Sequence, residues 1–351
     1  MIKSVLIANR GEIAIRIART ARRMGIKTYV VRTAKEPEAV YLSAADAVIN
    51  FPETDGNIPE FLDIDRLVGL AREYKIDSLH PGYGYLSENA ELAERCRDNG
   101  IVFIGPSPEV IRLMGDKVAA KGIAAQSGVP MLGASQGAGH TLDEARKIAK
   151  RLGYPVIIKA VSGGGGRGMR IVHHQDELEQ LYKIATAEAQ VAFNDPSVFI
   201  EKYLENPKHI EFQIVADNYG NVVHLGEREC SIQRKHQKLM EEAPSPALDE
   251  RLRKKMAAAA VSLAKQAGYQ SLGTVEFLLD HQKHFYFMEM NTRIQVEHPV
   301  TEEITGIDLV ELQFNIAAGR KLPLRQSQIH LNGWSIECRI NAEDVQAGFS
   351  P

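Results

Sequence analysis

Two apolar runs, 155–159 and 169–172, are joined by the segment Lys159-Ala160-Val161-Ser162-Gly163-Gly164-Gly165-Gly166-Arg167-Gly168-Met169. Both runs read as strands, which predicts a hairpin loop between them, because a P-loop would lead into a helix. Four consecutive glycines cost chain entropy that a simple turn does not require. They let backbone N–H groups approach an anion and let the loop close over it, while Lys159 and Arg167 supply positive charge. The alternative is a plain surface hairpin, in which both cations are incidental.

The N-terminal third has the pattern of a doubly wound parallel sheet. The run Val5 to Ala8 reads as a buried strand, and a helix with one apolar face follows it before a second strand at 27–32. Helical patterns recur at 66–74 and 89–98, and a strand at 101–104 is followed by a helix that begins at Ser107-Pro108. We therefore predict an α/β domain over residues 1–115.

The remaining chain is predicted to be α+β. A capping box at Thr141 starts a helix that ends at Gly153, and these elements with the glycine-rich hairpin predict a small lobe over about 131–204. Alternating strands then predict an antiparallel sheet, with strands at 209–216, 222–228, 273–280, 285–291 and 334–341 and helices at 249–267 and 308–318. This places a second domain at 116–330 and the start of a further subdomain at 331–351.

The composition is that of an ordinary globular protein. Among 351 residues, 42 Lys and Arg face 45 Asp and Glu, and 44% of the residues are apolar. These values exclude a collagen-like or largely disordered chain and argue against a dedicated nucleic-acid binder. No apolar stretch is long enough for a membrane span, and three widely spaced cysteines fit no disulfide framework. We therefore expect a cytoplasmic protein with neither nucleic acid nor membrane as a partner.

Two carboxylates and an amide form the first candidate site. Glu276 lies in one predicted strand, and Glu289 and Asn291 share a face of the next. A hairpin would bring the two strands side by side, so these oxygens could bind Mg²⁺ or Mn²⁺ that bridges phosphates. The alternative is a pair of solvated faces on edge strands.

The polar alternation continues from Glu289 to Glu297, through Arg293 and Gln295. A straight strand would separate its ends by about 26 Å, so a single site requires a bend, which we expect near Thr292. The order then gives metal ligands, an anion-binding Arg and Gln, and a carboxylate base. The alternative is one face of an exposed amphipathic strand.

Three other features remain open at this level. Arg339 shares a strand face with Glu337, so it is either an oxyanion-stabilising cation or half of a plain ion pair, and the pair is the simpler interpretation. The basic run 234–238 is a solvated face or an anion-facing loop. The turn His80-Pro81-Gly82-Tyr83-Gly84-Tyr85 is structural or lies beside a substrate.

Together the motifs resemble the biotin carboxylase family of the ATP-grasp superfamily. The resemblance covers the whole chain and rests on long literal stretches, at 7–14, 80–89, 114–117, 163–169, 201–207, 289–301 and 338–344. It implies a Rossmann-like, pre-ATP-grasp N-terminal domain, an ATP-grasp domain with a mobile lid, and the start of a C-terminal biotin carboxylase subdomain. The family domain normally continues beyond residue 351, so we expect a fragment of a longer polypeptide or weak ATP binding.

The resemblance also implies site residues. ATP would be held by Lys117, Lys159, Gly165, Gly166, His209 and His236, with the adenine on Glu201, Lys202, Tyr203 and Leu204. Two Mg²⁺ or Mn²⁺ ions would bind Glu276, Glu289 and Asn291. Bicarbonate would bind Lys238, Arg293, Gln295 and Val296. The catalytic group would be Glu297 as the base, Arg339 beside the biotin enolate, Arg293 and Lys238.

The implied reaction is the ATP-dependent carboxylation of biotin through carboxyphosphate. The chain has no Ala-Met-Lys-Met-type attachment site, so the biotin would be carried by a separate biotin carboxyl carrier protein or domain. A carboxyltransferase and a homodimer of the full-length form are the other implied partners. The final carboxyl acceptor is not encoded in this sequence.

Three other functions compete with this one. Another ATP-grasp ligase, such as a carbamoyl-phosphate synthetase or a purine-pathway carboxylase, would lack the run 293–299 together with Arg339. A nicotinamide-dependent oxidoreductase would need GxGxxG in the first turn, where the chain has Ala8-Asn9-Arg10-Gly11-Glu12. A nucleotide-binding module without turnover would not need Glu297 or Arg339.

Overall fold

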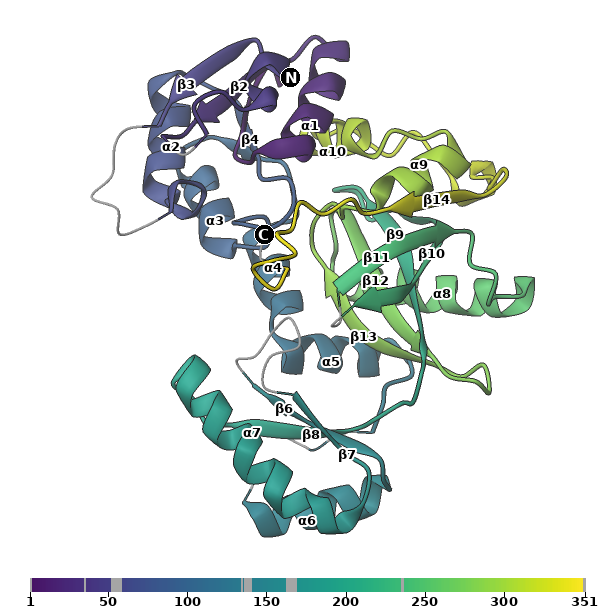
Figure 1. The fold of residues 1–351 in the computed structure, drawn as a ribbon. Coiled ribbons are helices and arrows are strands. Elements are labelled where there is room, and N and C mark those ends of the chain that lie inside the picture. Colours follow the sequence, from purple (N-terminus) through teal and green to yellow (C-terminus); the bar gives the residue numbers. More distant parts are fainter. Residues whose placement is uncertain are drawn as a thin grey trace.

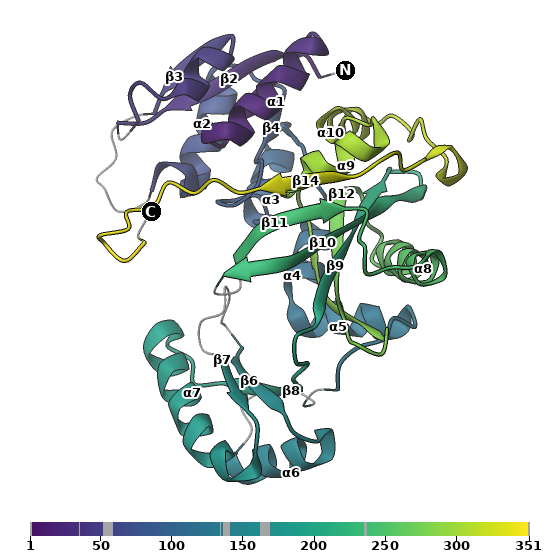
Figure 2. The same ribbon diagram turned by 45° about the vertical axis from the view of Figure 1, so that its right-hand side comes forward.

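The computed structural model describes most of the chain, namely residues 2–34, 36–51, 59–133, 135, 141–161, 169–234 and 237–349. Figures 1 and 2 show a parallel-sheet region, a central antiparallel sheet and a smaller lobe below it. The predicted fold class, α/β followed by α+β, is confirmed. Among the described helices, none combines the length and the apolar character that crossing a membrane would require.

The N-terminal region is built on a parallel sheet with the strand order β3-β2-β1-β4-β5. The strands are β1 (Ser4–Ile7), β2 (Lys27–Arg32), β3 (Ala47–Asn50), β4 (Ser78–His80) and β5 (Val102–Phe103). The helices are α1 (Gly11–Arg23), α2 (Ile64–Glu73), α3 (Ala90–Asp98) and α4 (Pro108–Gly115), with short 3₁₀ turns η1 (Val40–Ala44) and η2 (Glu60–Leu62). The strand order reverses between β1 and β4, and the carboxyl ends at such a point form the usual ligand crevice of open α/β sheets.

The turn after β4 lies at this switch point. Asn9, which follows β1, is buried, and its Nδ2 donates to the carbonyls of Pro81 (2.7 Å) and Tyr83 (2.8 Å). Gly82 has φ +65° and its Cα lies against Asn9, where a Cβ would meet Nδ2 at 2.8 Å. Glycine is therefore required there, and the sequence 80–85 forms a rigid turn that fixes Tyr83.

The small lobe consists of a three-stranded antiparallel sheet with helices on it. The order is β7-β6-β8, and α6 and α7 pack against this sheet (Figure 1). The elements are α6 (Leu142–Leu152), β6 (Val156–Ala160), β7 (Met169–Val172), η3 (Gln175–Glu177), α7 (Leu178–Phe193) and β8 (Val198–Lys202). β6 and β7 pair from Lys159 with Met169, as the predicted hairpin requires, while the glycine-rich loop at 162–168 lies outside the described residues.

The central sheet is antiparallel, with the order β13-β12-β9-β10-β11-β14. Its strands are β9 (Lys208–Ala216), β10 (Val222–Arg234), β11 (Gln237–Ala243), β12 (Ser271–Leu279), β13 (Phe285–Asn291) and β14 (Ser335–Cys338). The accompanying helices are α5 (Lys117–Gln126), α8 (Glu250–Gln266), α9 (His298–Thr305), α10 (Leu309–Ala317) and the 3₁₀ turn η4 (Gln326–Gln328). α5 and α8 bury one face of the sheet in an apolar core. The opposite face carries the polar side chains considered next.

Candidate active site

The candidate site is centred on an ammonium group shared by three carboxylates. Lys238 on β11 places its Nζ 2.6 Å from Glu211 Oε2, 3.0 Å from Glu276 Oε1 and 2.7 Å from Glu297 Oε1. Burial opposes the charge on Lys238, but the three carboxylates outweigh it and raise its pKa well above the usual value. The basic run 234–238, for which the sequence left a solvated face or an anion-facing loop open, therefore ends inside β11 with Lys238 turned into the site. Lys235 and His236 lie outside the described residues.

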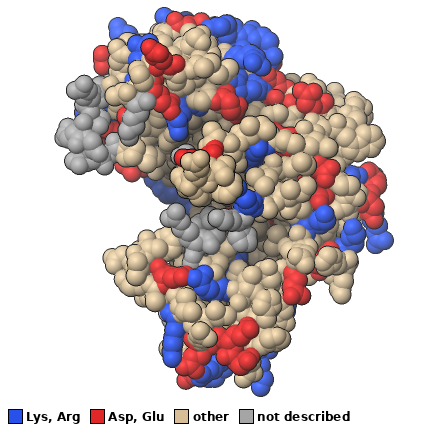
Figure 3. Space-filling model, viewed as in Figure 1, with Lys and Arg blue, Asp and Glu red and all other residues tan. Residues whose placement is uncertain are grey.

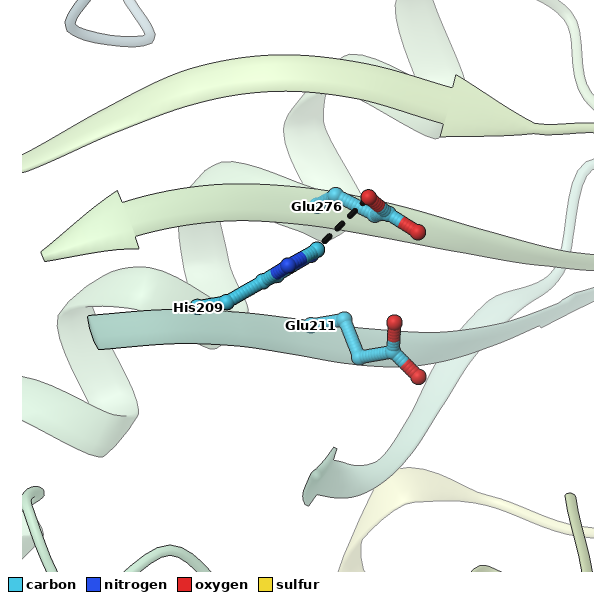
Figure 4. Close-up of side chains that lie close together, drawn as sticks. All are labelled: His209, Glu211 and Glu276. Atoms are coloured by element: carbon cyan, nitrogen blue, oxygen red, sulfur yellow. Dashed lines mark hydrogen bonds and ion pairs between the residues drawn. The ribbon is translucent and has the colours of Figure 1, made fainter. Parts of the chain in front are cut away.

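Glu276 accepts hydrogen bonds from several directions. Figure 4 shows His209 and Glu211 on β9 facing Glu276 on β12, with His209 Nε2 2.9 Å from Glu276 Oε2. Asn291 Nδ2 and Gln295 Nε2 donate to Glu276 Oε1 at 2.8 and 3.0 Å. Burial works against ionisation, but Lys238 and His209 hold the pKa of Glu276 well below its ordinary value. Glu276 is thus a fixed anion at neutral pH.

Arg228 on β10 holds several residues of this cluster through hydrogen bonds. This role of Arg228 was not predicted from the sequence. Its guanidinium is fully buried and makes five hydrogen bonds. The acceptors are Glu211 (2.5 Å), Gln213 (2.8 Å), Thr301 (2.9 Å), Thr274 (3.2 Å) and Gln295 (2.8 Å). The one sequence signal for Arg228 is its place inside a run that was expected to be a strand. A charged residue in a buried strand needs partners, because charged residues are rarely buried without them.

Glu297 lies between two cations. It directly precedes α9, with Oε1 on Lys238 and Oε2 2.9 Å from Arg339 NH2. Burial raises the pKa of Glu297, but the charges of Lys238 and Arg228 outweigh this effect and bring it down to about 2. Glu297 is therefore ionised at neutral pH, as a proton acceptor must be.

Arg339 follows β14 and reaches the same cluster. Its Nε donates to Glu241 Oε1 at 2.7 Å, and its NH2 bridges Glu241 and Glu297. The simple Arg339–Glu337 ion pair suggested by the sequence is wrong: within the described part of the chain, the ion pairs of this guanidinium are with Glu241 and Glu297. Glu241, like Arg228, was missed because its partner lies 98 positions away.

The chain bends where β13 ends at Asn291. Arg293 Nε donates to Glu88 Oε2 (2.8 Å) and its NH2 to Asn291 Oδ1 (2.9 Å). Gln295 and Glu297 are buried, so the interpretation of this run as an exposed strand is wrong. The bend brings Asn291, Gln295 and Glu297 to one cluster, while Val296 stays half-buried beside them.

α5 connects this cluster with the small lobe. Partial loss of hydration and the carboxylates of Glu276 and Glu88 raise the pKa of Glu289, although this residue is exposed. The charge of Lys117, which begins α5, opposes part of the rise. One turn later, Lys121 pairs with Glu201 on β8. Residues four apart lie on the same face of a helix, one turn from each other. Lys117 therefore acts on the central sheet, while Lys121, one turn along the same face, reaches the small lobe.

The lobe side of the site is also charged. Lys159 on β6 contacts the second oxygen of Glu201 at 2.6 Å, so Glu201 is shared by two lysines. Lys202 donates its Nζ to the carbonyls of Gly153 and Tyr154, which fixes this side chain against the lobe. Figure 3 shows the surface indented above the small lobe, with Lys and Arg on the upper margin and both basic and acidic residues on the lower margin. Gly165 and Gly166 are outside the described residues.

Comparisons with known proteins agree on one family. Two family models match, "Biotin carboxylase, N-terminal domain" at residues 1–111 and "Carbamoyl-phosphate synthase L chain, ATP binding domain" at residues 116–325. The chain is 54% identical over 347 residues to a biotin carboxylase of Nostoc sp., covering 99% of this chain and 77% of that protein.

Two solved structures extend the comparison. The biotin carboxylase–βγ-ATP complex from Campylobacter jejuni has a TM-score of 0.94 at 48% identity, covering 100% of this chain and 78% of that one. The biotin carboxylase domain dimer of the Hydrogenobacter thermophilus 2-oxoglutarate carboxylase, in complex with MgADP, ADP and bicarbonate, has a TM-score of 0.93 at 50% identity. It covers 100% of this chain and 77% of that one.

Proposed function

Because the chain belongs to the biotin carboxylase family, we propose that it uses ATP and bicarbonate to carboxylate the biotin of a carrier protein or domain. The observation that carries the proposal is the setting of Glu297. Its two oxygens contact Lys238 at 2.7 Å and Arg339 at 2.9 Å, so a proton acceptor, an anion-binding ammonium and a guanidinium converge. Such a group of charges suits a reaction in which negative charge builds up.

The residues fit a divalent cation with a nucleotide. Glu276 and Glu289 are directly paired across β12 and β13, and Asn291 adds an amide oxygen at the strand end. Partial loss of hydration and the repulsion of Glu276 and Glu88 raise the pKa of Glu289, which is exposed at the strand surface, and a divalent ion would offset this repulsion. We assign Glu276, Glu289 and Asn291 to two Mg²⁺ or Mn²⁺ ions, which when bound would neutralise the phosphate oxygens.

The nucleotide is assigned to the hollow between the central sheet and the small lobe. Lys117 and Lys159 would contact its phosphates, and His209 would lie beside them. The backbone from Glu201 to Leu204 would receive the adenine, which the fixed side chain of Lys202 supports. Gly165, Gly166 and His236 belong to this proposal on the family resemblance alone.

The chemistry then follows from the charges. Bicarbonate held by Lys238, Arg293, Gln295 and Val296 gives its proton to Glu297, and its oxygen attacks the γ-phosphate, which releases ADP and leaves carboxyphosphate. Carboxyphosphate divides into CO₂ and phosphate, and the phosphate takes the ureido proton of biotin. The biotin nitrogen attacks CO₂ while Arg339 stabilises the enolate-like oxygen. Water must be excluded, because it would hydrolyse the mixed anhydride.

The partners and boundaries are part of the same proposal. A biotin carboxyl carrier protein would deliver the biotin, and a carboxyltransferase would pass the carboxyl group to an acceptor that this site does not specify. We propose a cytoplasmic homodimer, with a domain at 1–115, an ATP-grasp domain at 116–330 whose lid spans about 131–204, and a C-terminal portion from 331. The change from a parallel to an antiparallel sheet supports the first boundary.

The test is ATP hydrolysis that requires bicarbonate and rises with free biotin. Arg339→Ser should lower biotin carboxylation, and with it the stimulation by biotin, by about 10- to 100-fold. It should keep the hydrolysis that depends on bicarbonate alone. Hydrolysis that depends on ammonia or on a purine intermediate instead would assign the chain to another ATP-grasp ligase. An Arg339→Ser enzyme that carboxylates biotin normally would disprove the assignment of Arg339.

A further inference from the structure

Glu241 is a buried carboxylate beside Arg339, and the proposed reaction assigns no role to it. It lies on β11, where its Cα pairs with that of Glu337 on β14, and its side chain is fully buried. Figure 2 shows β14 running along β11 as the edge of the central sheet. Glu241 Oε1 accepts from Arg339 Nε at 2.7 Å and lies 2.6 Å from Arg339 NH2.

We propose that Glu241 is a positioning residue that holds the Arg339 guanidinium at the angle needed to reach the biotin oxygen. This inference rests on the proposed function and adds a residue to it. Glu241 touches neither substrate nor reacting atoms, and it acts only through Arg339.

The geometry explains why a single carboxylate would not suffice. Glu241 holds the Nε edge of the guanidinium, while Glu297 contacts only NH2. Two carboxylates on different elements therefore fix both the position and the plane of a side chain that otherwise has several rotatable bonds. Without Glu241, nothing among the described residues would hold the Nε edge, and the plane of the guanidinium would no longer be fixed.

The burial of Glu241 also points to a function rather than to stability. Its Oε2 is buried and has no hydrogen-bond partner among the described residues, which is unfavourable for folding. Burial raises the pKa of Glu241, and the guanidinium of Arg339 opposes the rise. Removing one partner of such a pair is costly, whereas replacing both partners by well-packed apolar residues is often neutral, so stability does not require the pair.

Glu241→Gln tests the proposal, and Glu242→Gln is the matched control. Gln keeps the shape of Glu241 but removes its charge, and Glu242 is the next residue on β11, where the side chain points to the other face. We expect Glu241→Gln to lower kcat/KM for free biotin by about 10- to 100-fold. Bicarbonate-dependent ATP hydrolysis without biotin should stay within about twofold, as should every activity of Glu242→Gln.

The double variant with Arg339→Ser separates positioning from a structural effect. If Glu241 acts only through Arg339, Glu241→Gln should cause no further loss in an Arg339→Ser background. The proposal would be overturned if the loss in the double variant were the product of the losses in the two single variants. Normal biotin kinetics in Glu241→Gln alone would also overturn it. Should Glu241→Gln not fold, Glu241→Asp keeps the charge but withdraws it by one methylene, and the same dependence on Arg339 is expected.

The outcomes also separate this inference from the proposed function. If the parent chain shows no biotin-dependent turnover, or if Arg339→Ser matches the parent, the proposed function fails and the positioning of Arg339 fails with it. If both behave as expected and Glu241→Gln matches the parent, only the assignment of Glu241 is wrong.

Discussion

Replacing Arg228 by methionine tests whether one buried cation holds the floor of the site together. Methionine has a similar length and no charge, so the variant removes all five hydrogen bonds of the guanidinium while filling much of its volume. The four neutral acceptors, Gln213, Thr274, Gln295 and Thr301, are buried and lose this donor. Within the described part of the chain, Lys238 is then the one cationic partner that Glu211 keeps.

The expected cost follows from this burial. Removing one partner of a buried ion pair costs about 3–5 kcal/mol, against a total stability of about 5–15 kcal/mol for a domain. An unfolding entropy of about 2.1 cal/mol/K per residue over 351 residues gives about 0.7 kcal/mol/K. The midpoint of thermal unfolding should therefore fall by about 4–7 °C if the chain unfolds as one unit.

Thermal unfolding followed by circular dichroism measures this shift, and Arg97→Met is the matched control. Arg97 on α3 pairs with Glu94 and Glu109 at the surface, where ion pairs contribute about 0–1 kcal/mol. Its midpoint should move by about 1.5 °C or less. If Arg228→Met moves the midpoint no further than Arg97→Met does, Arg228 is not the support that its contacts indicate.

Two further variants test the electrostatics of the site. Burial and the charges of Glu241 and Glu297 raise the pKa of Glu337 to about 7. In this pH range the folded chain binds a proton at Glu337 that the unfolded chain releases. The parent should therefore lose stability relative to Glu337→Gln as the pH rises from about 5 to 7, and lose no more above about pH 8. Thermal midpoints of the two proteins that differ by the same amount at every pH would contradict this. Glu289→Gln should raise the Mg²⁺ concentration for half-maximal ATP hydrolysis by about tenfold or more, and an unchanged Mg²⁺ titration would remove Glu289 from the metal site.

The fold could be predicted from the sequence where its signals are local. The apolar run of β1, the alternation along β9 and the capping box before α6 each specify an element from neighbouring residues. The prediction stopped short in β10, which was expected to end at 228 and extends to Arg234. The pairing of this stretch with β11 is interrupted by register shifts between Glu229 and Gln233, and such bulges cannot be read from the alternation of polar and apolar residues.

The site could be predicted only in part, because its contacts join distant positions. Lys238 meets Glu297 across 59 positions and Arg228 meets Thr301 across 73. The spacing of Glu276, Glu289 and Asn291 suggested oxygen ligands, whereas the assignments of Lys238 and Arg339 depended on the family resemblance. No local pattern identifies the partner of a buried charge, since that partner is set by strand order and register.

The register of β9 decides at once which side chains enter the core and which enter the site. Ile210, Phe212 and Ile214 of β9 belong to the apolar core that includes α8, while Glu211 and Gln213, which alternate with them, face the site. β9 pairs with β12 so that Glu211 stands opposite Glu276. A slip of one residue would move the carboxylates into the core and the aliphatic side chains into the site. The packing of Phe212 against Phe277 opposes such a slip, so the apolar face of β9 holds the carboxylates in place as directly as Lys238 does.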